Sequence, residues 1–96
     1  MGDHSIIGQH LESLVSIIRS LRGPDGCPWD KAATTESMRP YLLEEVYEVL
    51  EALDDGNHQN QTDELGDLLF TVLLLGQILD EREPGSLASM VSSISE

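Results

Sequence analysis

Apolar residues recur at helical spacing through most of this chain, and this pattern constrains the fold more than any other feature. They fall three or four positions apart, as on one face of an α-helix, and no segment alternates as a half-buried strand does. The pattern predicts an all-α protein, bundle-like and formed by a single domain over residues 1–96. The apolar positions run along four predicted helices, at residues 5–22, 40–54, 63–80 and 87–94.

Segments rich in Gly, Pro and polar residues separate the predicted helices. Residues 22–30, RGPDGCPWD, indicate a loop. The polar run 54–62 indicates a connection, after which Thr62 or Asp63 is expected to cap the third helix. Pro40 follows a stretch of Thr and Ser that offers helix caps, so it is expected in the first turn of the second helix.

The predicted third helix carries apolar residues on nearly all sides. Leu65, Leu69 and Val72 share one face, while Leu74 and Ile78 cover much of the other. A helix of this kind is normally buried all round, and one chain of 96 residues does not provide that much cover. We therefore expect a homo-oligomer, either a homodimer or a homotetramer, with this helix at its centre.

The strong acidity of the chain narrows the classes of partner. Its 18 Asp and Glu residues against 5 Lys and Arg give a net charge of -13. Nucleic acids and anionic membranes both need a basic surface, so we expect neither as a partner. The single cysteine, Cys27, cannot form an internal disulfide, and the N-terminus does not read as a signal peptide. Together these features predict a soluble, cytoplasmic protein.

Two pairs of carboxylates occupy positions that an acidic surface alone does not explain well. Glu45 and Glu48 are three residues apart in the predicted second helix, and Glu64 and Asp67 have the same spacing in the third. Both pairs fall along the predicted bundle interior, and no Lys or Arg lies between residues 40 and 81 to offset them. Four carboxylates on two facing helices suit Mg²⁺ or Mn²⁺. The alternative is a solvated acidic face, although like charges at this spacing oppose each other.

Two motifs in the same chain resemble a known family. The segment LRGPDGCPWDKAATTESMRPYLLEEVYEVLEAL contains an EExxE motif, and the later ELGDLLF contains an ExxD motif. In this order they resemble the MazG family of nucleoside triphosphate pyrophosphohydrolases, which belongs to the all-α NTP pyrophosphatases. The resemblance covers residues 11 to about 80. It implies the MazG fold and the hydrolysis of an NTP or dNTP to the monophosphate and pyrophosphate with Mg²⁺, as housekeeping of nucleotide pools.

The resemblance also implies a role for each acidic residue of the two motifs. Glu44, which precedes the first pair, would orient or activate the attacking water and would form the catalytic group with Glu45 and Glu48. The four implied metal ligands are Glu45, Glu48, Glu64 and Asp67.

Three residues in and near the CPWD segment are implied substrate contacts. Trp29 would stack on a base or close the pocket, while Arg22 and Lys31 would meet phosphates. From the residues alone, Trp29 is equally well interpreted as an anchor packed on the core, and the two cations as solvated charges. The chain has Ala33 where the family usually has Gln, so the contacts of that Gln are not expected.

The residues alone leave two other functions possible. One is a catalytically weak helical module of the same fold, used for dimerisation or regulation, which predicts no metal-dependent release of pyrophosphate. The other is an acidic helical interaction domain without a ligand, which predicts no thermal shift with Mg²⁺ or Mn²⁺.

Overall fold

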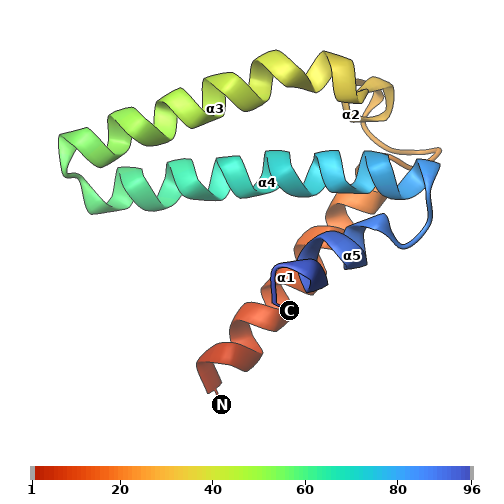
Figure 1. Ribbon diagram of the computed structural model, residues 1–96, viewed down its shortest axis with the longest axis horizontal. Coiled ribbons are helices and arrows are strands. Elements are labelled where there is room, and N and C mark those ends of the chain that lie inside the picture. Colours follow the sequence, from red (N-terminus) through yellow and green to blue (C-terminus); the bar gives the residue numbers. More distant parts are fainter. Residues whose placement is uncertain (1, 96) are drawn as a thin grey trace. The chain divides into compact units, whose positions relative to one another are not determined.

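The computed structural model describes residues 2–95, and all regular structure within this range is helical. No strand occurs in the described part of the chain, which confirms the predicted all-α class. The chain divides into two compact units, one ending at Ala33 and the other beginning at Thr34. Within the described range the helices are α1 (Gly2–Leu21), α2 (Pro28–Ala32), α3 (Thr35–Asp55), α4 (His58–Arg82) and α5 (Ser86–Ser93) (Figure 1).

The first unit contains α1 and α2, of which only α1 agrees with the sequence prediction. In α1 the apolar stripe is partly covered, since Ile18 is buried while Ile7 and Leu11 are exposed. The loop predicted over residues 22–30 is wrong over residues 28–30, because Pro28–Ala32 form α2. Pro28 occupies the start of α2, where the amide that proline lacks has no helical partner in any case.

Helix α3 begins earlier than the sequence pattern indicates, because Thr34 and Ser37 form a capping box. The Ser37 amide donates to the Thr34 hydroxyl at 3.0 Å, and the Thr34 amide donates to the Ser37 hydroxyl at 2.9 Å. Pro40 therefore lies inside the helix, and the prediction that it occupies the first turn is wrong. The capping box offsets part of the stability that proline removes from a helix interior.

Two residues, Gly56 and Asn57, connect α3 to α4. Gly56 has a φ of 73°, the left-handed conformation in which many helices end. The Asn57 side chain accepts a hydrogen bond from the Asn60 amide at 2.9 Å and so caps α4. Because this cap precedes the predicted one, α4 begins at His58, and the long polar connection expected from the sequence is wrong.

Helices α3 and α4 run side by side in opposite directions (Figure 1). Near the turn, Gln61 Nε2 donates to the Ala52 carbonyl oxygen at 3.2 Å. At the other end of the pair, Arg82 Nη2 donates to Thr35 Oγ1 at 3.1 Å. These contacts, together with the short turn, hold the register between the two helices.

Helix α5 packs on the C-terminal half of α4. A Cβ atom on Gly76 would lie 2.7 Å from Leu87 Cδ1, so glycine allows the two helices to approach closely. Asp80 Oδ1 accepts from the amides of Gly85 and Leu87, both at 3.0 Å. These two amides lie at the start of α5, so the carboxylate provides them with a hydrogen-bond acceptor. The buried apolar side chains of this unit are Met38, Val49, Ala52, Leu73, Leu74, Ile78 and Leu87.

The apolar line predicted for the second helix is exposed in the single chain. Leu43, Leu50 and Leu53 are each more than half exposed. Helix α3 buries instead the face that carries Val49 and Ala52, which also carries the first carboxylate pair. Among residues 2–95, no helix combines the length and the apolarity needed to cross a membrane.

Candidate metal centre

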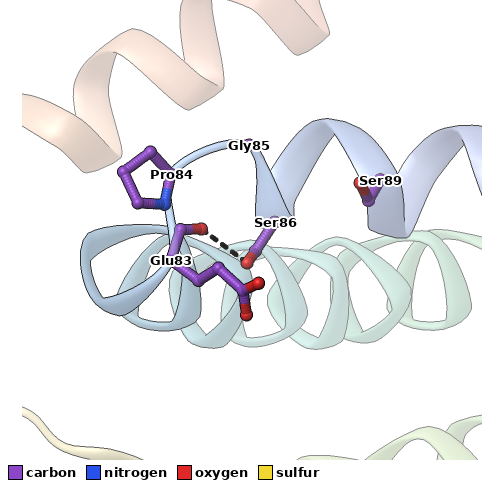
Figure 2. Close-up of a pocket in the computed structure, with 5 residues that line it drawn as sticks. All are labelled: Glu83, Pro84, Gly85, Ser86 and Ser89. Carbon is purple, nitrogen blue, oxygen red and sulfur yellow. Dashed lines mark hydrogen bonds between the residues drawn. The ribbon is translucent and has the colours of Figure 1, made fainter.

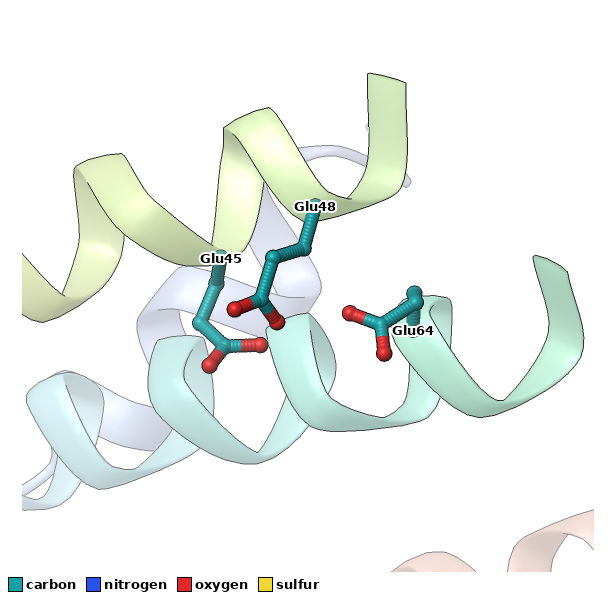
Figure 3. A group of neighbouring side chains, drawn as sticks. All are labelled: Glu45, Glu48 and Glu64. Atoms are coloured by element: carbon teal, nitrogen blue, oxygen red, sulfur yellow. The ribbon is translucent and has the colours of Figure 1, made fainter. Parts of the chain in front are cut away.

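Three carboxylates, Glu45, Glu48 and Glu64, converge between α3 and α4 (Figure 3). Each offers one oxygen atom, and these three atoms lie within 4.8 Å of one another. Glu45 and Glu48 point from α3 toward α4, and Glu64 points from α4 toward Glu48. All three are half-buried. In the described range, no other group of three His, Cys, Asp or Glu side chains has this geometry.

Two oxygen atoms of this group, Glu45 Oε2 and Glu64 Oε2, are buried and have no hydrogen-bond partner. A buried carboxylate oxygen that lacks both a donor and a cation is unfavourable. A divalent cation would satisfy both oxygens, and carboxylates are the ligands that a hard cation prefers. The residues present therefore fit a metal centre of the kind predicted from the sequence.

The close approach of like charges shifts the ionisation of this group. The pKa of Glu64 is raised from its ordinary 4.5 to about 7, first by a hydrogen bond with Glu48 and then by desolvation and the charges of Glu48, Asp67 and Glu45. Desolvation by burial raises the pKa of Glu45, with further contributions from the charges of Glu48, Asp67 and Glu44. Both shifts mean that the surroundings disfavour the negatively charged form of these two carboxyl groups.

Asp67 and Glu44 lie outside the converging group. The Asp67 side chain is exposed, although its charge acts on both Glu45 and Glu64. Its backbone carbonyl accepts a hydrogen bond from Thr71 Oγ1 at 3.2 Å. Glu44 is exposed as well, and its charge also acts on Glu45. The structure thus brings three of the four predicted ligands together and leaves Asp67 and Glu44 beside them.

A concavity of about 250 Å³ opens next to the carboxylates, toward the turn between α3 and α4. Its lining includes Glu48 and Glu64 together with Glu51, Asp55 and Asn60. Glu51, Asp55 and Asn60 are not among the site residues predicted from the sequence. Glu51 and Asp55 follow Glu48 at helical spacing, which is a signal for a shared face. The position of Asn60 depends on the short turn, for which the sequence offers no such signal.

A second concavity, of about 340 Å³, lies at the junction of α4 and α5 (Figure 2). Glu83, Pro84, Gly85, Ser86 and Ser89 line it. The Ser86 hydroxyl donates to the Glu83 carbonyl oxygen at 2.6 Å. A single carboxylate beside two serine hydroxyls provides neither a metal cage nor a nucleophile with a base. The larger volume therefore does not mark the candidate site.

The three predicted substrate contacts all belong to the first unit. Arg22 Nη1 donates to the backbone carbonyl oxygens of Asp30 at 2.6 Å, Ala33 at 2.7 Å and Lys31 at 3.3 Å. The Lys31 ammonium is exposed and donates to a carbonyl of the preceding loop at 3.0 Å. Trp29 is 51% exposed, so half of its surface is accessible to a ligand.

Comparison with known proteins shows the family to which the chain belongs. A family model described as the MazG nucleotide pyrophosphohydrolase domain matches residues 33–96. This stretch contains both acidic motifs and the whole carboxylate group. The chain therefore belongs to the MazG nucleotide pyrophosphohydrolase domain family, as the resemblance of its motifs predicts.

Three curated relatives illustrate this similarity. The chain is 44% identical over 85 residues to the nucleoside triphosphate pyrophosphohydrolase/pyrophosphatase MazG of Thermotoga maritima, covering 88% of this chain and 33% of the relative. It is 39% identical over 87 residues to the nucleoside triphosphate pyrophosphohydrolase of Escherichia coli, and the aligned part covers 90% of this chain and 33% of the relative. It is 40% identical over 94 residues to the uncharacterized protein YabN of Bacillus subtilis, and the aligned part covers 98% of this chain and 19% of the relative. The chain thus spans a third or less of the length of these relatives.

Proposed function

We propose that this chain hydrolyses nucleoside triphosphates, NTP or dNTP, to the monophosphate and pyrophosphate. The observation that carries the proposal is the convergence of Glu45, Glu48 and Glu64, with two buried oxygens that lack partners. Relatives named for this reaction align with most of the chain. The activity suits housekeeping of nucleotide pools in the cytoplasm, a reducing compartment that fits the free thiol of Cys27.

The proposed cofactor is Mg²⁺, with Mn²⁺ as a substitute. Glu45, Glu48 and Glu64 would hold it, and Asp67, three residues after Glu64 on the same helix, would be the fourth ligand. When bound, the cation supplies the positive charge that neutralises a triphosphate and acidifies water. Without that charge, a protein with a net charge of -13 repels an anionic substrate, so the activity depends fully on metal.

Glu44 is the proposed residue that orients the attacking water. It is exposed, and it projects about 100° around the helix from Glu45, so its carboxylate is separate from the three that converge. In this position it accepts a proton from the water as the water attacks phosphorus. The sequence has no Ser, Cys or His with a partner at a recognisable spacing, which favours water over a protein nucleophile.

Trp29 and Lys31 are the proposed contacts to the substrate. The accessible half of Trp29 suits stacking on a base. One hydrogen bond to the backbone leaves Lys31 with further N–H donors for a phosphate. Stacking tolerates different bases because every base has a π-face, so we expect turnover of more than one NTP.

We also propose that the chain forms a homodimer or a homotetramer through an apolar stripe on α3 and α4. At about 100° per residue, the exposed leucines of the two antiparallel helices emerge on the same side of the pair. A contiguous exposed apolar surface marks an interface, and a second copy presents the same surface for two-fold pairing. The apolar stripe consists of Leu43, Val46, Leu50, Leu53, Leu65, Leu69 and Val72.

The bond that is cleaved can be tested by hydrolysis in ¹⁸O-labelled water. Attack at the α phosphorus places the label in the monophosphate and leaves pyrophosphate unlabelled. Label in orthophosphate, with a nucleoside diphosphate as the other product, would contradict the proposed reaction. Absence of metal-dependent pyrophosphate release from every NTP tested would favour the catalytically weak module instead.

A further inference from the structure

Helix α2 is too short to be stable by its own hydrogen bonds. It contains 5 residues, and its N-cap, Cys27, makes no side-chain capping bond. Isolated helices much longer than this are only marginally stable in water, because one turn fixes several residues for few bonds. The contacts that keep α2 helical must therefore come from outside it.

Arg22, just beyond the end of α1, supplies such contacts. Its Nη1 donates to the carbonyl oxygens of Asp30, Lys31 and Ala33, which lie at the C-terminal end of α2. A helix end leaves its last carbonyls short of helical partners, and of these three the Asp30 oxygen also accepts from the Ala33 amide at 3.3 Å. A positive charge at a helix C-terminus is also favoured by the helix dipole. The guanidinium thus caps α2 both by hydrogen bonds and by charge.

The loop between α1 and α2 is built to bring this guanidinium to α2. The Gly26 amide donates to the Gly23 carbonyl oxygen at 3.0 Å and closes a tight turn. A Cβ atom on Gly26 would collide with the carbonyl oxygens of Ser20 and Leu21, so the turn lies directly against the end of α1. The short span between Arg22 and α2 follows from this close approach.

We infer that Arg22 is a positioning residue that holds α2, and with it Trp29, in place for the substrate. This inference rests on the proposed function and replaces the phosphate contact that the family resemblance implies for Arg22. Trp29 is the second residue of α2, between the proline at its start and the capped carbonyls at its end. Loss of the cap frees Trp29 to move, and a mobile ring loses more entropy on stacking against a base.

The first test uses the protein without nucleotide. Trp29 is the only tryptophan, so all tryptophan fluorescence comes from α2, and at an unchanged oligomeric state its anisotropy reports on the local motion of α2. We expect Arg22→Gln to lower the anisotropy and to speed hydrogen exchange of the amides of residues 31–33 about tenfold, the loss expected for charged hydrogen bonds. Arg39→Gln removes the same charge from an exposed pair with Glu36 and should leave both readings unchanged.

The second test measures coupling to turnover. We expect Arg22→Gln to raise KM about tenfold with little change in kcat, and the double variant with Trp29→Ala to be no worse than Trp29→Ala alone. Arg22→Lys keeps the charge but lacks the planar fork, so it should resemble Arg22→Gln and also serves if Arg22→Gln does not fold.

Three results would overturn the assignment. One is unchanged anisotropy and hydrogen exchange in the Arg22 variants. The second is full retention of KM by Arg22→Lys, and the third is multiplicative effects of Arg22→Gln and Trp29→Ala, since both indicate direct phosphate binding. If the wild-type protein turns over no NTP, the proposed function fails, while anisotropy and exchange still decide whether Arg22 holds α2.

Discussion

Glu48 is the carboxylate on which the ionisation of its neighbours depends most. A hydrogen bond with Glu48 is the main cause of the raised pKa of Glu64. After desolvation, the charge of Glu48 contributes most to the raised pKa of Glu45. Like charges held this closely oppose folding, so the arrangement is better explained by a bound cation than by stability.

Glu48→Gln should separate the contribution of Glu48 to metal-dependent turnover from its effect on the stability of the metal-free protein. We expect turnover at saturating Mg²⁺ to fall by about 100-fold or more, because a ligand is lost. The metal-free protein should become more stable by about 0.3 kcal/mol, because repulsion is relieved. Thermal unfolding and pyrophosphate release measure the two outcomes. Glu36→Gln, which changes an exposed residue of the same helix, is the matched control, and near wild-type turnover of Glu48→Gln would refute its role.

The raised pKa of Glu64 predicts a pH dependence of stability. The folded protein holds this proton more tightly than the unfolded chain, so the stabilisation is fully present below pH 4.5 and is lost as the pH rises through about 7. We expect the Tm of the metal-free protein to fall across this window, and Glu64→Gln to flatten the decrease. Affinity for Mg²⁺ should rise over the same window, because the cation binds the deprotonated carboxylate. An unchanged pH slope in Glu64→Gln would contradict this assignment.

Among the helical elements, the pair α3 and α4 determines the geometry of the candidate metal centre. Its turn consists of Gly56 and Asn57, and the Asp55 carboxylate accepts from the Asn57 amide at 2.8 Å and from Asn60 Nδ2 at 2.9 Å. A turn this short allows little variation in register. The distance between Glu48 and Glu64 therefore depends on the backbone conformation of the turn.

Gly56→Ala tests this dependence. The φ of 73° at Gly56 is unfavourable for a residue with a Cβ, so we expect a loss of about 1 kcal/mol in the free energy of unfolding. Urea denaturation measures this loss. Gly8→Ala, inside α1 with no atom within 4 Å of the added Cβ, should be neutral or stabilising. Equal stability of Gly56→Ala and wild type would show that the turn tolerates another conformation.

For the whole molecule, the apolar stripe is the feature that a single chain leaves unexplained. Its leucines are exposed on α3 and α4, while the carboxylates between the same helices are half-buried. Burial of the stripe against a second copy would remove apolar surface from water and cover the helix pair that carries the metal centre. Assembly and activity are therefore expected to be linked.

A charge in the stripe should prevent this assembly. Leu50, which is 51% exposed, can be replaced by Lys without strain in the single chain, so we expect Leu50→Lys to yield folded monomers. Sedimentation at micromolar concentration measures the change. Ile94→Lys is the control, since Ile94 is 86% exposed and lies outside the stripe. A wild-type protein that is already a stable monomer would contradict the proposed oligomer.

The sequence predicts those parts of the fold that depend on local spacing. The residues of α1, α3, α4 and α5 show the helical period, and Glu45, Glu48 and Glu64 lie on inward faces as that period indicates. The starts of α3 and α4 are predicted too late, because the caps at Thr34 and Asn57 act before the apolar pattern begins. Helix α2 is missed because a cap from outside, Arg22, makes it helical.

What the sequence by itself determined is therefore the all-α class, the family and three of the acidic residues that converge at the candidate site, since these depend on residue type and spacing along one helix. Tertiary structure alone decided which carboxylates meet, leaving Asp67 exposed beside the converging three. It also decided that α3 buries Val49 rather than the apolar line through Leu50. The physical reason is that burial and contact depend on what packs against a helix face, whereas periodicity only determines which residues share that face.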